Sequence, residues 1–414
     1  MAQTGDWVTP RLWGKPWFEK PPLLYWTTAV AFEAGLDADL APRLPVALIS
    51  VAFLVYFFTV LRREFGELAA FYATTILATS AGWLAYSHVA VTDLPMSAAF
   101  AAAMFTACRS DAGSRSRFAY AAGAGVLLGL AVLAKGLVPL ALFLPAVWFL
   151  RHRLKDLFVI FAAAMLVAAP WYVLVFWRNG ATFVDVFFVE QTFGRFRSTA
   201  LGHDQPFWFY LPVLLAALFP WTPLLALLFQ KRSYQDARAR FLLVWVLWGL
   251  VFFSVFLNKL PGYLLPLLPA VATLLGILIA GANRSAKMVV LVASSAGLLW
   301  CIPAIQDLLP QALLSGVSHV RIELPLAWIG PALAIMAACT LLERSGRRPS
   351  ALALIGLVTL LSVIRMVWQV YPVLDRTYSA RGSWATHLNC ITNENRTRRY
   401  GLNYYLGREL PDCN

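Results

Sequence analysis

Residues 5–26 combine charged and aromatic side chains and then pass directly into an apolar segment. The stretch reads GDWVTPRLWGKPWFEKPPLLYW, and its charged residues are Asp6, Arg11, Lys15, Glu19 and Lys20. Charges placed at a membrane boundary are costly unless they bind something. Pro21 and Pro22 fix φ and remove two N–H donors, so Glu19 and Lys20 lie on a stiff, non-helical elbow. This arrangement favours an anionic, lipid-borne ligand, and the alternative is an interfacial belt of Trp and Lys without chemistry.

Three short segments elsewhere place single polar groups between apolar runs. Asp93 precedes a Leu-Pro pair in SHVAVTDLPM, and Lys135 separates two apolar runs in VLAKGLVPL. Lys259 and Tyr263 stand in NKLPGY, where Pro and Gly shape a turn. Each residue also has a simpler interpretation: Asp93 can cap a helix, and Lys135 can extend to the lipid headgroups.

A fourth segment, FVDVFFVEQTFGRFRSTALGHDQPFWFY over residues 183–210, alternates polar and aromatic side chains. It contains Glu190, Arg195 and His203. Glu190 with His203 or Glu19 could hold a divalent metal ion, although sequence spacing does not show that they meet.

Together these residues indicate chemistry on a sugar phosphate. The cations Lys20, Lys135, Lys259 and Arg195 suit a phosphate, and the carboxylates of Glu19, Asp93 and Glu190 suit a hydroxylated group or a metal. A lipid carrier would explain why these groups border apolar spans. The sequence lacks a glycine-rich nucleotide loop, so a nucleotide sugar or ATP is not expected as the direct substrate.

The elements that carry these residues are predicted to be transmembrane helices. The chain is 60% hydrophobic and only 13% charged, which is not typical of soluble globular proteins. Apolar runs of sufficient length predict an all-α polytopic membrane protein of about twelve spans. The runs cover residues 44–61, 68–87, 94–108, 118–134, 137–150, 157–177, 208–229, 241–257, 264–282, 288–304, 325–342 and 350–370. A shorter run over 23–36 is predicted to lie at the membrane interface.

Basic residues in the connecting loops predict the orientation. Seventeen Lys and Arg fall on six short loops, whereas the short loops of the other side, 88–93, 135–136 and 258–263, carry only Lys135 and Lys259. The basic loops are therefore expected in the cytoplasm, and the candidate site residues on the periplasmic face of a bacterial inner membrane. The net charge of +13 is explained by this topology, without nucleic acid as a partner.

This topology defines three parts of the chain. Residues 1–43 form an outer segment with an interfacial helix, and residues 44–370 form a membrane bundle with an outer loop at 178–207. Residues 371–414 form a short periplasmic tail. Cys390 and Cys413 both lie in this tail, where an oxidising compartment allows a disulfide. Cys108, Cys301 and Cys339 fall in apolar spans and are expected to be packing residues.

The motifs resemble those of bacterial lipid A aminoarabinose transferases and their protein O-mannosyltransferase relatives, which are membrane glycosyltransferases of the GT-C class. The resemblance covers the GDW…EKPP stretch, VTDLPM, the AKG turn, QPFWFY and NKLPGYLLP. It implies a donor made of a polyprenyl phosphate and a sugar, and an acceptor hydroxyl on a lipid or glycan.

The resemblance also implies roles for single residues. Glu19 corresponds to a metal-associated carboxylate, and Lys20, Lys135 and Tyr263 correspond to groups around the lipid phosphate. Asp93 corresponds to a second outer-loop acid and is the candidate catalytic residue. The segment after Glu190 often carries Glu-His in the family, whereas here Gln191 follows.

Family members usually have a first helix and an Asp-Glu motif ahead of the GDW segment, and here the sequence begins at Met1. We therefore expect a chain without that helix and acid. The leading hypothesis is a polyprenyl-phosphate-sugar-dependent glycosyltransferase. The alternatives are a non-catalytic remnant that binds polyprenyl phosphate, and a transporter of lipid-linked glycans. A transporter would place polar groups near the membrane midplane rather than at one face.

Overall fold

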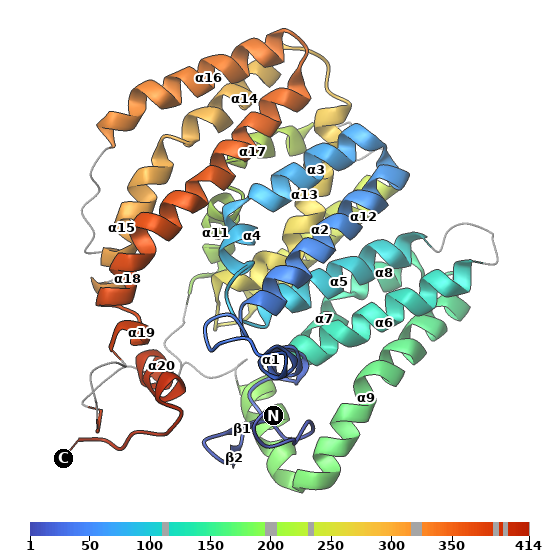
Figure 1. The fold of residues 1–414 in the computed structure, drawn as a ribbon. Helices are drawn as coiled ribbons and strands as arrows, with labels where there is room; N and C mark the ends of the chain where they lie inside the picture. Colours follow the sequence, from blue (N-terminus) through green and yellow to red (C-terminus); the bar gives the residue numbers. More distant parts are fainter. Residues whose placement is uncertain are drawn as a thin grey trace. The chain divides into compact units, whose positions relative to one another are not determined.

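The computed structural model describes residues 1–109, 116–194, 205–230, 236–315, 325–383, 389–391 and 396–413. The chain divides into two compact units, Met1–Asn283 and Arg284–Asn414. Both are mainly helical, and the first also contains one short hairpin. Figure 1 shows the helices of both units.

The first unit contains the hairpin and sixteen helical segments within its described residues. In chain order they are β1 (Arg11–Leu12), β2 (Lys15–Pro16), α1 (Leu23–Glu33), α2 (Leu44–Phe65), α3 (Glu67–Thr79), α4 (Ala81–Tyr86), α5 (Asp93–Cys108), α6 (Arg117–Lys135), α7 (Val138–Leu142), α8 (Leu144–Phe149), α9 (Leu154–Val184), η2 (Asp185–Gly194), η3 (Phe207–Phe209), α11 (Tyr210–Ala217), η4 (Thr222–Phe229), α12 (Ala237–Val255), η6 (Pro261–Leu267) and α13 (Leu268–Ala280).

The second unit is helical in its described part apart from residues near the chain end, which include an isolated bridge between Ile391 and Asp412. Its elements are α14 (Ala286–Leu298), α15 (Cys301–Ser315), η8 (Leu326–Trp328), α16 (Ile329–Arg344), α17 (Arg348–Arg365), η9 (Met366–Val370), α18 (Tyr371–Thr377), α19 (Ala380–Ser383) and α20 (Arg396–Leu406).

The prediction of an all-α membrane protein is confirmed, and each of the twelve apolar runs coincides with helix. Among the described residues, eight helices are long and apolar enough to cross a membrane. The runs over 68–87, 94–108, 137–150 and 208–229 give shorter or broken helices instead. The last of them bends by 116° between Phe207–Ala217 and Thr222–Phe229. Proline explains the breaks in the runs over 137–150 and 208–229, because it favours the first turn of a new helix. The helices α7, α8 and η4 each have a proline in their first turn.

Close packing in the first unit depends on small residues. Helix α6 lies along both α5 and α9, and α3 lies along α13 (Figure 1). A Cβ at Gly125 would overlap the Ile160 carbonyl of α9, and one at Gly129 would lie 2.7 Å from Val167. Small residues four apart let helices approach closely where lipid supplies no hydrophobic driving force between them. Gly276 of α13 has the same role against α3.

The segment predicted as an outer loop over 178–207 is helical as far as residue 194. Helix α9 continues to Val184 with non-helical dihedral angles at Gly180, and the π-helix η2 follows. Phe183 and Phe187 are buried against Trp171 of α9. This aromatic packing explains why the chain turns at Gly180 and stays helical.

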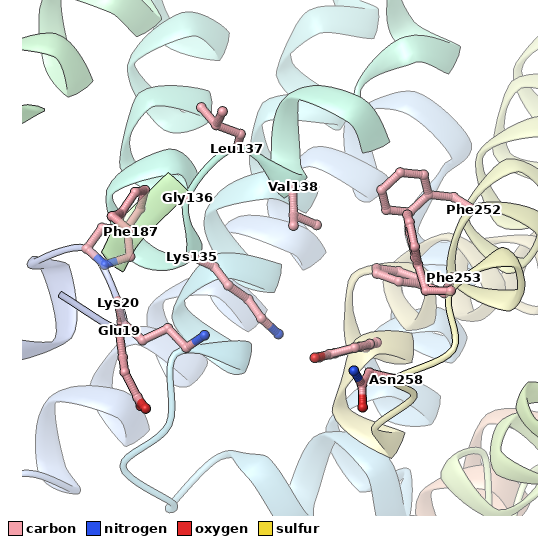
Figure 2. Close-up of a pocket in the computed structure, with 13 residues that line it drawn as sticks. Glu19, Lys20, Lys135, Gly136, Leu137, Val138, Phe187, Phe252, Phe253 and Asn258 are labelled. Carbon is pink, nitrogen blue, oxygen red and sulfur yellow. The ribbon is translucent and has the colours of Figure 1, made fainter. Parts of the chain in front are cut away.

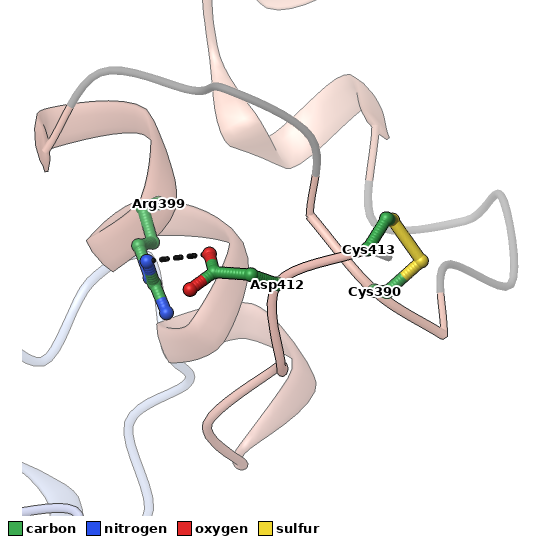
Figure 3. Close-up of a disulfide and its surroundings, with 4 residues drawn as sticks. All are labelled: Cys390, Arg399, Asp412 and Cys413. Carbon is green, nitrogen blue, oxygen red and sulfur yellow. Dashed lines mark hydrogen bonds and ion pairs between the residues drawn. A yellow bond between two sulfur atoms is a disulfide. The ribbon is translucent and has the colours of Figure 1, made fainter.

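The end of the chain forms a small disulfide-closed structure in the second unit. Cys390 and Cys413 are bonded, as predicted, with their Cα atoms 4.9 Å apart. Figure 3 shows this bond beside the ion pair between Arg399 and Asp412, at 2.8 Å. Ile391, Leu402 and Leu410 form a core with Ala380. The tail therefore has a folded core of its own.

Candidate active site

The N-terminal segment is held against α9 by polar contacts. Asp6 Oδ1 accepts hydrogen bonds from the backbone N–H groups of Val8 and Thr9, both at 3.1 Å, and from Arg178 at 2.9 Å. Burial alone would raise the pKa of Asp6, but these N–H groups and the guanidinium groups of Arg178 and Arg11 hold it below its usual value. Asp6 therefore acts as an anchor of the segment.

Two tryptophans extend this anchoring. The indole N–H of Trp171 in α9 donates to the Val8 carbonyl at 2.9 Å, and that of Trp26 in α1 donates to the Trp7 carbonyl at 2.8 Å. Polar indole groups at such positions are usually hydrogen-bonded. The segment is thus attached at both α9 and α1.

A tight hairpin follows the anchored residues. Arg11 pairs with Pro16 and Leu12 with Lys15, and both residues between them, Trp13 and Gly14, have positive φ. Positive φ at both central positions is the geometry of a type I′ turn. The hairpin returns the chain so that the Trp17 N–H donates to the Pro10 carbonyl at 2.8 Å.

Phe18 fixes the position of the Glu19-Lys20 pair. Its side chain is buried against Phe183 in an edge-to-face contact with ring centroids 5.3 Å apart. Helix α1 starts at Leu23, directly after the two prolines. The elbow predicted from the sequence is therefore present between a buried anchor and a helix start.

Lys135 and Asp93 form an ion pair at the same place. Lys135 Nζ lies 2.5 Å from Asp93 Oδ1, and 9% of the Lys135 side chain and 18% of the Asp93 side chain are exposed. The ammonium also lies 4.5 Å from the centre of the Tyr263 ring, a favourable cation–π distance. Lys135 therefore faces the protein interior, and the interpretation that it extends to the headgroups is wrong. The N-cap position of α5 is occupied by Thr92, and Asp93 is the first helical residue, so Asp93 is not the helix cap.

Glu19, Lys20, Lys135 and Tyr263 line one cavity of about 100 Å³. Its lining residues are Glu19, Lys20, Pro21, Lys135, Gly136, Leu137, Val138, Phe187, Phe252, Phe253, Phe256, Asn258 and Tyr263. Figure 2 shows the ammonium groups of Lys20 and Lys135 extending into the same space, with Asn258 on the other side. The charged residues on this wall are two lysines and one glutamate, which sum to one positive charge. The predicted convergence of Lys20, Lys135 and Tyr263 beside Glu19 and Asp93 is therefore observed.

Close approach around Gly262 brings Tyr263 to this position. A Cβ at Gly262 would lie 2.7 Å from the Tyr86 hydroxyl oxygen and 2.8 Å from Asp93 Oδ1. Such contacts require glycine, whereas its place in the sequence predicted only the shape of a turn. Asn258 and Phe187 could not be predicted as cavity residues, because no spacing rule connects them to the lysines.

Several predicted site residues lie elsewhere. Lys259 is buried and donates to the Gln205 carbonyl at 2.8 Å, and it is not among the cavity residues. Its neighbour Asn258 lines the cavity instead. Glu190 is exposed on η2. Arg195 and His203 fall outside the described residues.

The described residues do not form a metal site by themselves. None of them make a group of three or more Asp, Glu, His or Cys side chains placed to hold an ion. Glu19 is the carboxylate on the cavity wall.

Comparison with known proteins agrees with this architecture. Residues 19–177 match the family model for dolichyl-phosphate-mannose-protein mannosyltransferase. The undecaprenyl phosphate-alpha-4-amino-4-deoxy-L-arabinose arabinosyl transferase 2 of Pseudomonas fluorescens is 32% identical over 292 residues, 67% of this chain and 49% of that protein. The corresponding transferase of Erwinia tasmaniensis is 28% identical over 88% of this chain and 70% of its own length. The chain thus spans about half the length of several curated relatives that it matches.

Solved structures show the same fold. A crystal structure of ArnT from Cupriavidus metallidurans bound to undecaprenyl phosphate aligns with 99% of this chain and 78% of its own, with a TM-score of 0.79 and 23% identity. The archaeal oligosaccharyltransferase AglB from Archaeoglobus fulgidus aligns with a TM-score of 0.52 and 14% identity. In sequence and fold the chain is therefore similar to the GT-C membrane proteins that include the bacterial aminoarabinose transferases.

Proposed function

We propose that this protein is a glycosyltransferase that moves a sugar from a polyprenyl phosphate to the hydroxyl group of a lipid or glycan acceptor. The names of its relatives suggest undecaprenyl phosphate carrying 4-amino-4-deoxy-L-arabinose as the donor. The observation that carries the proposal is the cavity in which Lys20, Lys135 and Tyr263 meet a wall formed by phenylalanines. Such a site suits a phosphate that is attached to an apolar chain.

The reaction would use these groups as follows. The acceptor oxygen bonds to the anomeric carbon of the sugar while the bond from that carbon to the phosphate oxygen breaks, and the bonding electrons leave with polyprenyl phosphate. Negative charge grows on the departing phosphate, and the ammonium groups of Lys20 and Lys135 would stabilise it. A base must accept the proton of the acceptor hydroxyl, and Glu19 is the carboxylate that lines the cavity.

We propose that Asp93 positions Lys135 rather than acting as the base itself. Its carboxylate already binds the Lys135 ammonium at 2.5 Å. The pair would hold the cation against the Tyr263 ring and aim it at the phosphate. This role differs from the catalytic one that its family position implied.

We propose that the cavity opens on the periplasmic side of the inner membrane. Lys135 ends α6, whereas the opposite end of α6 starts at Arg117 beside the basic residues of the 109–117 connection. In intact spheroplasts, a membrane-impermeant maleimide should label a single cysteine that replaces Ala90 and should not label one that replaces Gly66. Labelling of only the cysteine at position 66 would contradict this orientation.

Binding of undecaprenyl phosphate to the purified protein tests the site. Lys20→Ala and Lys135→Ala should each weaken binding about tenfold or more, since a hydrogen bond to a charged group contributes about 1.5–3 kcal/mol. Lys15→Ala is the matched control, because Lys15 is exposed on the nearby hairpin. Unchanged affinity in both site variants would refute the phosphate assignment.

Transfer assays distinguish a transferase from a polyprenyl-phosphate-binding protein and from a transporter. Release of undecaprenyl phosphate from the sugar-loaded donor, dependent on an acceptor, supports the transferase. Tight binding without any release would instead indicate a polyprenyl-phosphate-binding protein. Movement of intact donor across proteoliposome membranes would indicate a transporter.

A further inference from the structure

A second cavity lies in the first unit, between the ends of helices α2, α5, α8 and α12. Its volume is about 300 Å³. The residues that line it are Val60, Glu64, Phe65, Phe105, Cys108, Arg109, Phe149, Arg238, Phe241 and Leu242. The proposed transferase reaction uses none of them.

The polar side of this cavity consists of two arginines around one glutamate. Arg109 Nε lies 3.1 Å from Glu64 Oε1, and Arg238 Nη1 lies 3.3 Å from Glu64 Oε2. Arg238 Nη1 also donates to the Glu64 carbonyl at 3.0 Å, so it spans the end of α2. The three side chains sum to one positive charge. Each guanidinium has five N–H donors in a planar fork, so an arginine that binds a carboxylate can bind a second anion as well.

The remaining walls of the cavity are apolar and mostly aromatic. Phe105 and Phe149 come from α5 and α8, and Phe241 comes from the first turns of α12. The Arg109 guanidinium lies 4.7 Å from the centre of the Tyr120 ring, which fixes its plane. A ligand for this cavity must therefore combine an anionic group with an apolar body.

The cavity lies at the end of the helices opposite to the Lys135 site. Helix α5 runs from Asp93 at that site to Cys108 at this cavity, and α12 runs from Arg238 here to Phe253 there. Fifteen residues of helix correspond to about 22 Å, which is most of the hydrocarbon thickness of about 30 Å. The two cavities thus lie at opposite ends of these helices, and this one lies at the end where the basic loops attach.

We propose that this cavity binds an anionic phospholipid of the cytoplasmic leaflet. The phosphate would lie between Arg109 and Arg238, whose guanidinium groups are both paired with Glu64. An acyl chain would lie along Phe105, Phe149 and Phe241. Basic pockets between transmembrane helices are suited to such headgroups. A bound lipid would tie the ends of α2, α5 and α12 together.

Cys108 provides a probe inside the cavity. It lines the cavity, and the other free thiols are Cys301 and Cys339. A Cys301→Ala/Cys339→Ala background therefore leaves Cys108 as the single thiol outside the Cys390–Cys413 disulfide. Its rate of reaction with N-ethylmaleimide is measured in nanodiscs of phosphatidylcholine, with and without phosphatidylglycerol.

Phosphatidylglycerol should slow the modification of Cys108 several-fold in the otherwise unchanged protein. Arg238→Gln should weaken this protection about fivefold, the factor that corresponds to about 1 kcal/mol for one arginine beside an anionic headgroup. Arg238→Lys should retain part of it. Arg62→Gln is the matched control, because Arg62 is exposed on α2 and does not line the cavity. Bilayer surface charge is the same for all variants, so differences between them report on the cavity.

Three results would overturn the proposal. Equal rates in the two lipid compositions, or protection that survives Arg238→Gln, would leave the Glu64 cluster as an ion-pair network without a ligand. Protection by inorganic phosphate in pure phosphatidylcholine nanodiscs would assign the cavity to a soluble anion instead of a lipid.

Discussion

Lys135 and Asp93 are 42 positions apart in the chain, yet their charged groups lie 2.5 Å apart. The pair joins the last residue of α6 to the first residue of α5. Neither charge is well exposed to water, so each depends on the other for stabilisation. The same contact fixes one of the two ammonium groups at the proposed phosphate site.

The stability of this pair can be tested with a double-mutant cycle. Lys135→Met should destabilise the protein by about 3 kcal/mol or more, because it leaves a partly buried carboxylate without its partner. Adding Asp93→Asn should restore part of that loss, which gives a coupling free energy of about 0.5–3 kcal/mol. The midpoint of thermal unfolding in detergent is the measurement. Strictly additive effects would show that the two side chains do not interact.

Gly262 offers an independent test of the geometry. Gly262→Ala should destabilise the protein by about 1–3 kcal/mol, the usual cost of an additional methyl group in a tightly packed place. It should also weaken polyprenyl-phosphate binding, because the new Cβ would displace Asp93 or Tyr86. Gly281→Ala is the control, since its nearest contact would be an ordinary 3.5 Å. Similar behaviour of the two variants would argue against the close packing around Gly262.

The helical membrane fold and the main site residues could be predicted from local sequence. Apolar runs mark membrane helices wherever they occur, and the charges of Lys20, Lys135 and Asp93 are conspicuous because they border such runs. The EKPP elbow was predictable from the fixed geometry of proline. These signals depend only on neighbouring residues.

Other features depend on contacts between distant segments and could not be predicted. Nothing near Lys259 in the sequence shows that it is bound to Gln205 while Asn258 faces the cavity. The extension of α9 and η2 to Gly194 arises because Phe183 and Phe187 pack on Trp171, a contact that periodicity does not reveal. The direct ion pair between Lys135 and Asp93 was likewise not predictable, because 42 positions separate the two residues.

The anchoring of the N-terminal segment should depend on pH. The folded-state pKa of Asp6 is lowered from its model-peptide value of 3.8. Its contribution to stability is therefore fully present above that value and is lost as the pH falls through the lower folded-state pKa. The difference in unfolding temperature between wild type and Asp6→Asn should be constant near neutral pH and shrink below pH 3.8. A difference that grows on acidification would contradict the contacts with Arg178 and the backbone.

The disulfide should stabilise the tail as a local unit. The Cys390–Cys413 bond closes a loop with a sequence separation of 23, for which the chain-entropy account gives about 3 kcal/mol. Replacing both cysteines by serine should raise the rate of amide hydrogen exchange at Leu402 and Leu410, which belong to the small core. Exchange at the buried Leu128 of α6 is the internal control. Two free thiols in protein isolated from an oxidising compartment would remove the basis of this prediction.

Removal of divalent metal tests the role of Glu19. The alternative to a role as the base is that Glu19 holds a divalent ion together with Glu190 or His203, because carboxylate and imidazole groups are common ligands of such ions. Chelation should then weaken undecaprenyl-phosphate binding several-fold in the wild type, since the ion would add positive charge beside Lys20. Glu19→Gln should have weakened binding from the start and should no longer respond to the chelator. His203→Ala and Glu190→Gln show which of the two completes the site, and Glu33→Gln, an exposed carboxylate on α1, is the control. If the wild type is insensitive to chelation while Glu19→Gln still weakens binding, Glu19 acts directly on the sugar or the acceptor and the metal hypothesis is wrong.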